Sequence, residues 1–564
     1  MHIGVPKKIR NHEYRTGMTP AGVREAVGVS SGRDIGWNGL RAWLQYLFIG
    51  MSAMFCTAAW AGVSPEQLMT EKCAACHLEG KIFQRISDIR KSPEGWEMTL
   101  VRMGIWHKVE LSQSERKTLV KYLADRQGLA PEESAPYRFL IERRPNVQDV
   151  LPTKELGEMC ARCHSFGRVA LQRRDLGEWR KLVETHVGQF PSIEYSAMGR
   201  DRNWLDLALN QVAPELAKRY PLHTAAWRKW RKTRHVPPTG TWRVVGNRPG
   251  WGDYAGYMYV QSLGADRYGV RYALQYDNGD RLSGQGHAIV YTGYEWRGAA
   301  RLGNQEVDSI FALSQDGKKM SGRWFLRDAD EVGAQFGAVR VDATAPGTLL
   351  AVSPAFIKTG ATTTVRLSGV KLGDKYDLGS GVKIDKLQRV SPDEVRLTLT
   401  VAPGASIGWR DIKEGRAGKA ARLALYRQID SLRVEPAFAI ARLGGGGGTT
   451  RPVSAQFQAI AYLDGPDGKA GTKDDIRLGP VAAKWSVENY DDTAKAANDV
   501  KFAGVMEPNG QFMPAQAGPN PARNNLDNVG NLSAVATLAD GQRSLTAKGH
   551  LVVAVQRWNT PPLR

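Results

Sequence analysis

The chain has 564 residues, enough for about three to five domains of the usual 100–200 residues each. Its 42% apolar and 24% charged residues are the proportions of globular proteins, so most of the chain can bury a core. The 60 glycines favour turn-rich β structure over helical bundles in part of the chain. The formal charge of +20 suits nucleic acid, an acidic protein or a membrane surface, and the choice depends on where the chain resides.

Residues 1–61 are predicted to be an N-terminal extension that contains a signal peptide. Arg41 is followed by an apolar run as far as Cys56, and Ala59-Trp60-Ala61 has the small-x-small pattern of a cleavage site, which predicts cleavage before Gly62. An N-terminal membrane anchor is the alternative, but the apolar run is shorter than the ~20 residues of a spanning helix. We therefore expect an exported mature chain without a membrane span and with a charge of about +16.

Two copies of one motif predict the covalent attachment of two haem c groups. The first copy is Cys73-Ala-Ala-Cys76-His77 and the second is Cys160-Ala-Arg-Cys163-His164. The two thiols of each copy can bond to the vinyl groups of one haem, and the adjacent imidazole then binds the iron as the proximal ligand. A zinc site is the alternative, but it needs further Cys or His ligands, and the mature chain keeps no other cysteine.

The two motifs and the signal peptide indicate the same compartment. Bacteria attach haem c outside the cytoplasm, so the apoprotein must be exported. We therefore expect a periplasmic protein that meets no nucleic acid. Its basic surface then favours acidic protein partners or a membrane surface.

The segments that follow the two motifs resemble each other. In the first, Met103 lies seven residues after Trp96, and in the second, His186 lies seven residues after Trp179. Seven residues are about two helical turns, so each pair shares one helix face, which we expect to contact the haem.

This repetition predicts the axial ligands of both irons. We assign His77 and Met103 to the first haem and His164 and His186 to the second. Other residues near these positions could take the sixth place: Met98, His107 and Met198. Because a thioether raises the potential relative to a second imidazole, electrons are expected to pass from the second haem to the first. Both irons would be saturated, so we expect electron transfer and no catalytic residue on this chain.

Residues 62–235 are predicted to be a helical diheme cytochrome c domain made of two units, 62–135 and 136–235. The apolar spacing of 111–123, after a Ser-led start, predicts the closing helix of the first unit, and 204–212 can play that part in the second. The run 227–234 alternates Trp with Lys and Arg. It is either a docking patch for an acidic partner or, as we favour, a solvated helix end before a linker.

The remaining sequence predicts all-β structure, so the fold class is multidomain α plus all-β. Closely spaced strands and tight turns at 277–280 and 315–317 predict an antiparallel β-barrel over 236–345. Short strands with Pro and Gly turns predict immunoglobulin-like sandwiches over 346–432 and 433–564. Four aspartates between 464 and 475 do not match the EF-hand pattern, so this segment is interpreted as an ordinary loop in preference to a calcium site.

The domain order and the spacings from Trp96 to Met103 and from Trp179 to His186 resemble the alpha subunit of quinohemoprotein amine dehydrogenase. The resemblance covers essentially the whole mature chain. It implies a periplasmic heterotrimer that oxidatively deaminates primary amines, with a β-propeller subunit and a small subunit that carries cysteine tryptophylquinone. It further implies that this subunit passes electrons from the quinone to a soluble cytochrome c or blue-copper protein.

Two other functional classes remain open. A diheme peroxidase would need one iron with an open position, which the proposed Met103 and His186 argue against. A haem-bearing sensor or adhesion protein would bind a ligand with its β domains. Co-purification with a small crosslinked quinone subunit separates the amine dehydrogenase from both.

Overall fold

The computed structural model describes residues 63–555, except positions 145, 146, 148, 191, 192, 194–201, 343, 345, 415–420 and 447–449. The predicted signal peptide, Cys56 and Met198 lie outside the described residues. No helix in the described part is long and apolar enough to cross a membrane. The chain forms two compact units, and each is described here by itself. The first holds the described residues up to Leu123 together with Arg174–Leu222, and the second holds Ala124–Arg173 and the described residues from His223 onward.

The first unit is mainly helical. Its elements are α2 (Pro65–His77), β1 (Leu78–Glu79), β2 (Ile82–Phe83), β3 (Ile89–Lys91), α3 (Pro93–His107), α4 (Gln113–Arg126, whose last turn belongs to the second unit), α9 (Leu176–Gln189), α11 (Trp204–Leu207), the π-helical turn η4 (Ala208–Val212) and α12 (Ala213–Arg219). The expected closing helix at 111–123 is therefore present as α4. It begins with a capping box, because Ser112 Oγ accepts from the amide of Glu115 at 3.2 Å and the Glu115 carboxylate accepts from the Ser112 amide at 2.7 Å.

The other long helices of this unit also begin at capping residues. Ser64 caps α2 and Ser92 caps α3, and each is followed by a proline at the first helical position. Asp175 caps α9 by accepting from the amide of Glu178 at 2.7 Å. One tryptophan from α3, Trp96, and one from α9, Trp179, are each only 1% exposed.

The second unit begins with short helices that pack on the barrel. These elements are α5 (Pro131–Ser134), the 3₁₀ turn η3 (Ala135–Tyr137), α6 (Arg138–Ile141), α7 (Lys154–Cys160), α8 (Gly167–Ala170), β4 (Gln172–Arg174, whose last residue belongs to the first unit) and α13 (Ala225–Lys232). Leu129, Ile141 and Leu171 form one apolar cluster with Ile310 and Phe325 of the barrel. The segment that carries the second Cys-x-x-Cys-His motif is thus fixed to the barrel wall.

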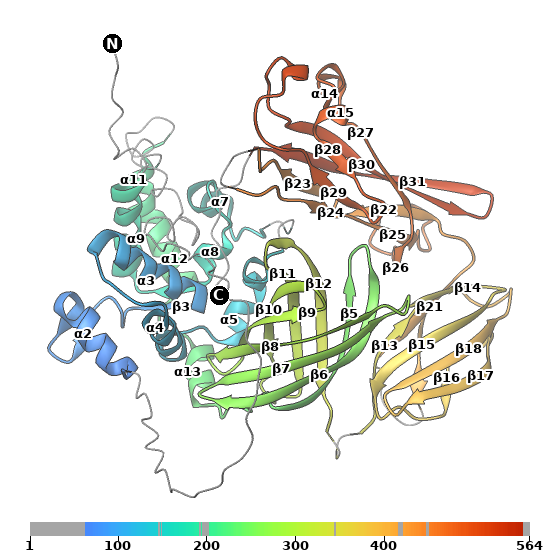
Figure 1. Cartoon of the computed structure of the whole chain (residues 1–564), viewed down its shortest axis with the longest axis horizontal. Coiled ribbons are helices and arrows are strands. Elements are labelled where there is room, and N and C mark those ends of the chain that lie inside the picture. The colour runs from blue at the N-terminus through green and yellow to red at the C-terminus, as the bar shows by residue number, and fades with distance from the viewer. Residues whose placement is uncertain are drawn as a thin grey trace, which may run out of the picture. The chain divides into compact units, whose positions relative to one another are not determined.

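The predicted antiparallel barrel is confirmed and has eight strands (Figure 1, green). They are β5 (Gly240–Arg248), β6 (Gly252–Gly264), β7 (Arg267–Tyr276), β8 (Arg281–Tyr291), β9 (Glu295–Leu302), β10 (Gln305–Leu313), β11 (Lys319–Leu326) and β12 (Ala329–Arg340). Each strand pairs with its neighbours along the chain, and β12 pairs with β5 to close the barrel. The predicted tight turns join β7 to β8 and β10 to β11.

Aromatic side chains fill the barrel interior. Phe311 and Phe336 stack with ring centroids 3.9 Å apart, and Trp242 and Trp296 are fully buried. Gly284 allows β8 to approach β9, because a Cβ there would lie 1.8 Å from a backbone oxygen of the neighbouring strand. The barrel is therefore a packed core, like other small barrels.

Helix α13 contributes to this core through one face only. Trp227 and Trp230 belong to the barrel's apolar cluster, and Trp230 Nε1 donates to the Thr292 carbonyl at 2.8 Å. The cations on the same helix are exposed: Arg228, Lys229, Arg231 and Lys232. The two tryptophans therefore attach α13 to the barrel, and the cations of the same helix form its solvent-exposed face.

The region after the barrel contains two sheets around one core. They have the strand orders β13-β15-β18-β17 and β14-β21-β19, with β16 and β20 as a separate pair. The strands are β13 (Thr348–Ser353), β14 (Phe356–Lys358), β15 (Thr362–Val370), β16 (Tyr376–Asp377), β17 (Val382–Ser391), β18 (Glu394–Val401), β19 (Gly408–Asp411), β20 (Lys413–Glu414) and β21 (Arg422–Tyr426). Val365, Leu397 and Leu423 are fully buried in the core that both sheets share.

The C-terminal region consists of three further sheets. Their strand orders are β22-β25-β26, β23-β31-β30-β27 and β24-β29-β28. The elements are β22 (Ser431–Glu435), β23 (Phe438–Arg442), β24 (Ala455–Gln456), β25 (Gln458–Leu463), β26 (Ile476–Val481), β27 (Lys484–Asn489), α14 (Asp492–Ala496), α15 (Asp499–Phe502), β28 (Gly504–Met506), β29 (Gln511–Pro514), η5 (Pro521–Arg523), β30 (Gly530–Asp540) and β31 (Arg543–Ala554). The immunoglobulin-like character of the last two regions stays a prediction.

Candidate haem sites

The first Cys-x-x-Cys-His motif occupies the C-terminal end of α2. Cys73 and Cys76 are free thiols, and His77 is the last helical residue. The chain then turns back through the β1–β2 hairpin, which brings the Gln84 carbonyl to 3.3 Å from His77 Nδ1. A carbonyl can only accept, so Nδ1 carries the proton and Nε2 is the nitrogen that can bind a metal.

Burial and nearby charges keep the His77 imidazole neutral. Its pKa is lowered, first by burial and further by Arg85 and His107, while Glu178 acts in the opposite direction. A neutral imidazole is the form that ligates iron. The same interactions place His107 and Glu178 within electrostatic range of His77, although both are distant from it in sequence.

The second motif follows a different local structure. Cys160 ends α7, while Cys163 and His164 lie in the bend after the helix. Asp149 holds that bend by accepting from Ser165 Oγ at 2.8 Å and from the Phe166 amide at 2.6 Å. His164 Nδ1 lies 3.0 Å from the Ser165 carbonyl, so Nε2 is again the nitrogen that could bind a metal.

Burial holds the first thiol of each motif in its protonated form at neutral pH. Burial raises the pKa of Cys73, with a further contribution from Cys76. Burial also raises the pKa of Cys160 to about 12, helped by Glu155. Thioether formation adds an S–H across a vinyl group, and these thiols retain the proton that this addition uses.

Each predicted sixth ligand lies on a helix with its tryptophan. Trp96 and Met103 are on α3, and Trp179 and His186 are on α9. Met103 is half-buried and belongs to the same unit as His77. His186 Nδ1 donates to the Leu182 carbonyl at 2.7 Å, the arrangement already seen for His77 and His164.

The predicted pairs differ in which compact unit holds them. The first unit holds the first motif, α3 and α9, whereas the second motif lies in Ala124–Arg173 of the second unit. The pairing of His77 with Met103 is therefore internal to one unit. His164 and His186 belong to different units, and both pairings stay predictions.

These residues fit haem c. Three imidazoles have Nδ1 bound by a backbone carbonyl, which is the usual support of a metal-ligating histidine. Trp179 Nε1 is buried and has no hydrogen-bond partner among the described residues, so an acceptor supplied by a bound group would satisfy it.

The sequence pattern of Trp96 to Met103 and of Trp179 to His186 did not reveal a buried cation that precedes each tryptophan. Lys91, five residues before Trp96, lies with its ammonium 5.6 Å from the centre of that ring. Arg174, five residues before Trp179, lies with its guanidinium 5.8 Å from the centre of the corresponding ring. Both cations are buried. Extending the repeat by five residues toward the N-terminus would have revealed them.

Glu178 is the buried carboxylate beside these cations. It is 1% exposed and lies within 3.3 Å of nitrogen atoms of Arg85, Arg174 and Lys181. Burial opposes its ionisation, but the hydrogen bonds from Lys181 and Arg85 outweigh that effect and lower its pKa.

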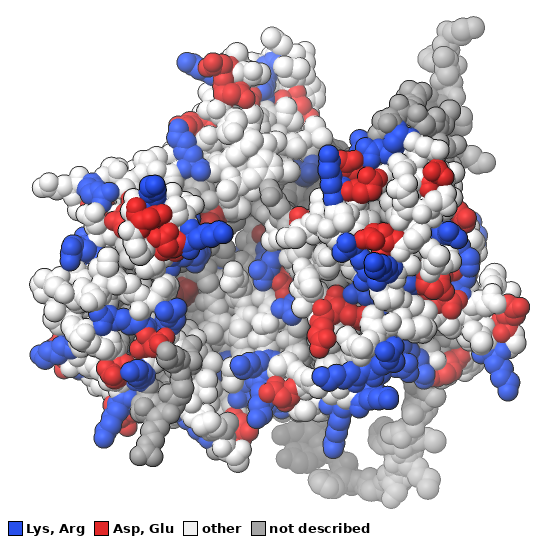
Figure 2. All heavy atoms as spheres, turned by 180° about the vertical axis from the view of Figure 1, so that it is seen from behind, with Lys and Arg blue, Asp and Glu red and all other residues white. Residues whose placement is uncertain are grey.

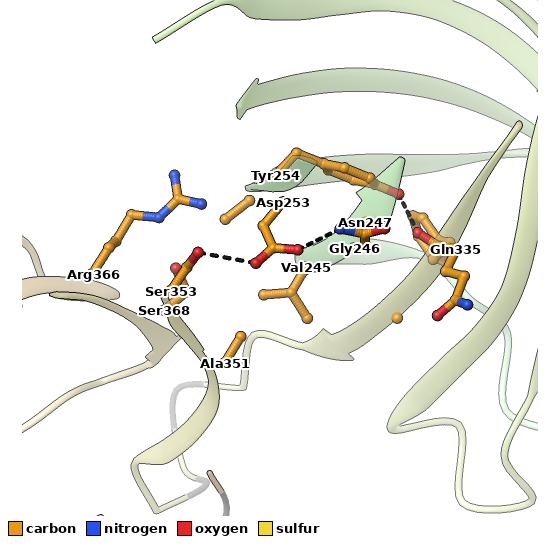
Figure 3. A pocket seen from close by; sticks show the side chains of 13 residues that line it. Val245, Gly246, Asn247, Asp253, Tyr254, Gln335, Ala351, Ser353, Arg366 and Ser368 are labelled. Carbon is orange, nitrogen blue, oxygen red and sulfur yellow. Dashed lines mark hydrogen bonds between the residues drawn. The ribbon is translucent and has the colours of Figure 1, made fainter. Parts of the chain in front are cut away.

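Two hollows lie in the second unit, and neither has a convergent set of unsatisfied polar groups. One, of about 350 Å³, lies between the barrel and β13 and β15 (Figure 3). Two of its polar side chains bind Asp253: Asn247 donates to it at 2.7 Å, and Ser353 donates to the same carboxylate at 2.9 Å. Arg366 Nε is buried there without a hydrogen-bond partner among the described residues. The other is a broad groove of about 1060 Å³ lined mainly by residues of β6–β9.

The loop at 464–475 is held by its own side chains. Thr472 Oγ1 donates to Asp474 at 2.6 Å, Asp467 accepts from the Lys469 amide, and Arg433 pairs with Asp475. Throughout the described residues, no group of three or more His, Cys, Asp or Glu side chains is placed to hold a metal ion. On the face shown in Figure 2, Lys and Arg are interspersed with Asp and Glu and form no single basic patch.

A helical region with two Cys-x-x-Cys-His motifs, followed by an eight-stranded barrel and further sheets, defines a multidomain haem-binding protein. Four family models match it in succession, all for quinohemoprotein amine dehydrogenase: the alpha-subunit haem-binding domain at residues 63–227, domain II at 236–341, domain III at 346–427 and domain IV at 432–563. The chain therefore belongs to the family of quinohemoprotein amine dehydrogenase alpha subunits.

Other comparisons add little. None of the curated proteins matches the chain. Solved structures with similarity include a redesigned β-barrel, mFAP1, bound to DFHBI (16% identity, 18% of this chain and 93% of that chain, TM-score 0.16). Another is mouse clustered PcdhgC3 EC1-3 (11% identity, 42% and 76%, TM-score 0.16). A third is Bacteroides ovatus SGBP-B in complex with a mixed-linkage heptasaccharide (12%, 57% and 63%, TM-score 0.17). TM-scores this low support no argument about fold or function.

Proposed function

We propose that this chain is the electron-transfer subunit of a periplasmic quinohemoprotein amine dehydrogenase. The observation that carries the proposal is the presence of two complete Cys-x-x-Cys-His motifs within a chain that four models of this family match from residue 63 to 563. Bound haem c would supply one-electron chemistry between a quinone on a partner subunit and a soluble cytochrome c or blue-copper acceptor.

The residues of this chain hold and orient the two haems. Cys73 and Cys76 would attach the first, and Cys160 and Cys163 the second. The carbonyl of Gln84 binds His77 Nδ1 and would thereby leave Nε2 to ligate the iron. The Ser165 and Leu182 carbonyls do the same for His164 and His186. Met103 completes the proposed ligand set.

The substrate chemistry is assigned to other subunits. We expect cysteine tryptophylquinone on a small partner and a β-propeller as the third subunit, as the family resemblance implies. The proposed saturation of both irons leaves no position for peroxide, so this chain would not act as a diheme peroxidase. The packed interior of the barrel gives no support to a ligand-binding sensor that would use the barrel as its cavity.

Amine-dependent reduction of haem in the purified complex is the most direct test. The complex should contain two haems per alpha chain, and a primary amine should reduce them without added mediator. The isolated alpha chain is the control, and amine should leave its haems oxidised. A haem-loaded chain that never associates with a quinone-bearing subunit would contradict the proposal.

The ligand assignment of the first haem can be tested separately. Met103→Ala should abolish the charge-transfer absorption of a thioether-ligated ferric haem. His107→Ala is the matched control, because His107 ends the same helix and acts electrostatically on His77. Retention of that absorption in Met103→Ala would contradict Met103 as the ligand, and its absence from the wild type would favour His107 in its place.

A further inference from the structure

Helix α13 and the residues just after it carry a dense set of cations that no nearby acid neutralises. We call this set the cation face of α13, and its members are Arg228, Lys229, Arg231, Lys232 and Arg234. All five are exposed, and none is paired with an Asp or Glu side chain among the described residues. The neighbouring sequence offers no partner either, because no Asp or Glu occurs between Glu215 and Asp253.

The spacing of these cations opposes helix stability. Arg228 lies three residues before Arg231 and four before Lys232, so like charges are neighbours on the helix surface and repel each other. The partial negative charge at the C-terminal end of a helix favours cations in its last turn. It does not account for Arg228 in the first half of α13 or for Arg234 beyond the end of the helix. Local helix stability therefore does not explain the density of cations, whereas an anionic partner would neutralise them.

The fold holds the cation face in place. Trp227 and Trp230 are only 5% and 6% exposed and belong to the core of the barrel, against which α13 lies (Figure 1). Trp230 Nε1 donates to the Thr292 carbonyl at 2.8 Å. At the start of the helix, the Thr224 hydroxyl donates to the Glu133 carboxylate at 2.9 Å. Because the backbone that presents the cations is already ordered, a partner that docks there does not bear the entropic cost of ordering it.

The composition of this face indicates which kind of partner it fits. Cations attract an acidic surface over a distance and accelerate the encounter. Permanent subunit interfaces are apolar at their centre and depleted of lysine, whereas the tryptophans of α13 are buried in the barrel and only its cations are exposed. A helix that binds a membrane surface inserts its apolar face into the lipid, but the barrel occupies the apolar face of α13. The cation face therefore suits a soluble acidic protein that docks transiently.

We propose that the cation face of α13 is the docking site of the soluble electron acceptor, and that the acceptor meets it with a surface rich in Asp and Glu. The inference rests on the proposed function, because it assigns the acceptor that this function requires. It replaces the sequence-based interpretation of residues 227–234 as a solvated helix end. It concerns this one helix and not a basic side of the molecule, since Lys and Arg are interspersed with Asp and Glu on the face shown in Figure 2.

The test measures the second-order rate constant with which the amine-reduced complex transfers electrons to plastocyanin, an acidic blue-copper protein. The variant carries Arg228→Gln, Lys229→Gln, Arg231→Gln and Lys232→Gln. At an ionic strength of about 0.01 M, its rate constant should fall about tenfold or more, because electrostatic steering is lost. At about 1 M, where charges are screened beyond about 3 Å, the variant and the wild type should agree. Mitochondrial cytochrome c, a basic protein, should show no such fall.

A matched control removes the same charge elsewhere in the second unit. It replaces by Gln four exposed lysines that are scattered over the sheets: Lys375, Lys386, Lys469 and Lys484. We expect its rate constant with plastocyanin to stay near that of the wild type. The variant Arg228→Lys with Arg231→Lys keeps the charge of the cation face and should also keep the rate, which separates charge from packing. Equal slowing in the scattered control, or an unchanged rate in the α13 variant, would overturn the inference.

Two further measurements distinguish the remaining explanations. Phosphatidylglycerol vesicles that sediment with the wild type but not with the α13 variant, together with equal transfer to plastocyanin by both, would assign the face to a membrane and overturn the inference. Reduction of the haems of the wild type by amine, measured without an acceptor, tests the proposed function by itself. No reduction would contradict that function, whereas normal reduction with transfer that does not depend on α13 would overturn the docking site alone.

Discussion

Replacing Glu178 by glutamine should destabilise the helical unit by about 3–5 kcal/mol. This is the cost of breaking a buried ion pair by removing one partner, because the other charge is left uncompensated. The Arg174 side chain is 5% exposed, so its guanidinium would lose its carboxylate without gaining water. Arg85 and Lys181 are about half exposed and would be solvated after the change, so they add little to the cost.

The assay is urea unfolding at neutral pH, followed by the helical far-ultraviolet circular dichroism band. Lys181→Met is the matched control, and an exposed partner of this kind is worth about 0–1 kcal/mol. Equal destabilisation by Glu178→Gln and Lys181→Met would refute the reasoning, because it would mean that the buried Arg174 contact contributes nothing beyond the exposed ones.

The pH dependence gives the same prediction a second readout. The pKa of Glu178 is lowered in the folded chain, because hydrogen bonds from Lys181 and Arg85 outweigh burial. A lowered carboxyl pKa contributes stability above the unfolded value of about 4.3, and this stability is lost as the pH falls through the folded pKa. The free energy of unfolding of the wild type should therefore fall toward that of Glu178→Gln only in acid, below about pH 4.3. If this difference in the free energy of unfolding disappeared between neutral pH and pH 5, the result would contradict a lowered pKa of Glu178.

Two further predictions concern the barrel. Trp230→Ala should destabilise it by about 3–5 kcal/mol in urea unfolding, because a buried indole and its hydrogen bond are lost, whereas Leu263→Ala, at a 57% exposed position, should have little effect. Gly284→Ala should cost about 1–3 kcal/mol in the same measurement, because its Cβ would collide with the Arg301 carbonyl. Gly404→Ala, where nothing lies within 4 Å, should be neutral or stabilise by about 0.4–1 kcal/mol, and similar values for the two glycine variants would contradict the close-approach argument.

The barrel was predictable because its signals are local. The turn at 277–280 and the turn at 315–317 each join two strands that are neighbours in both sequence and space. The closure of β12 on β5 was not predictable from such signals, because it joins strands nearly a hundred residues apart. The filled interior could not be predicted either, since a tryptophan in a strand does not reveal whether its face is a ligand cavity or a packed core.

The candidate haem sites were predictable only in part for a related reason. A cysteine motif predicts the attachment point, and an internal repeat predicts the helix of each candidate sixth ligand. The Gln84 carbonyl that orients His77 comes from a hairpin, and its role depends on backbone geometry that no residue type indicates. The sequence also did not predict that α9 belongs to the first unit. Helical periodicity shows that one face of a helix is buried, but it does not show which element packs against that face.

The two copies also differ in the chemistry of their cations, and the difference has a physical consequence. Burial lowers the pKa of both side chains, and for Lys91 it lowers the pKa well below the ordinary value, whereas the pKa of Arg174 is lowered to about 10 from a higher starting value. An arginine therefore keeps its charge at this position of the repeat more readily than a lysine does. The two copies are unequal in this cation as well as in the proposed ligands Met103 and His186.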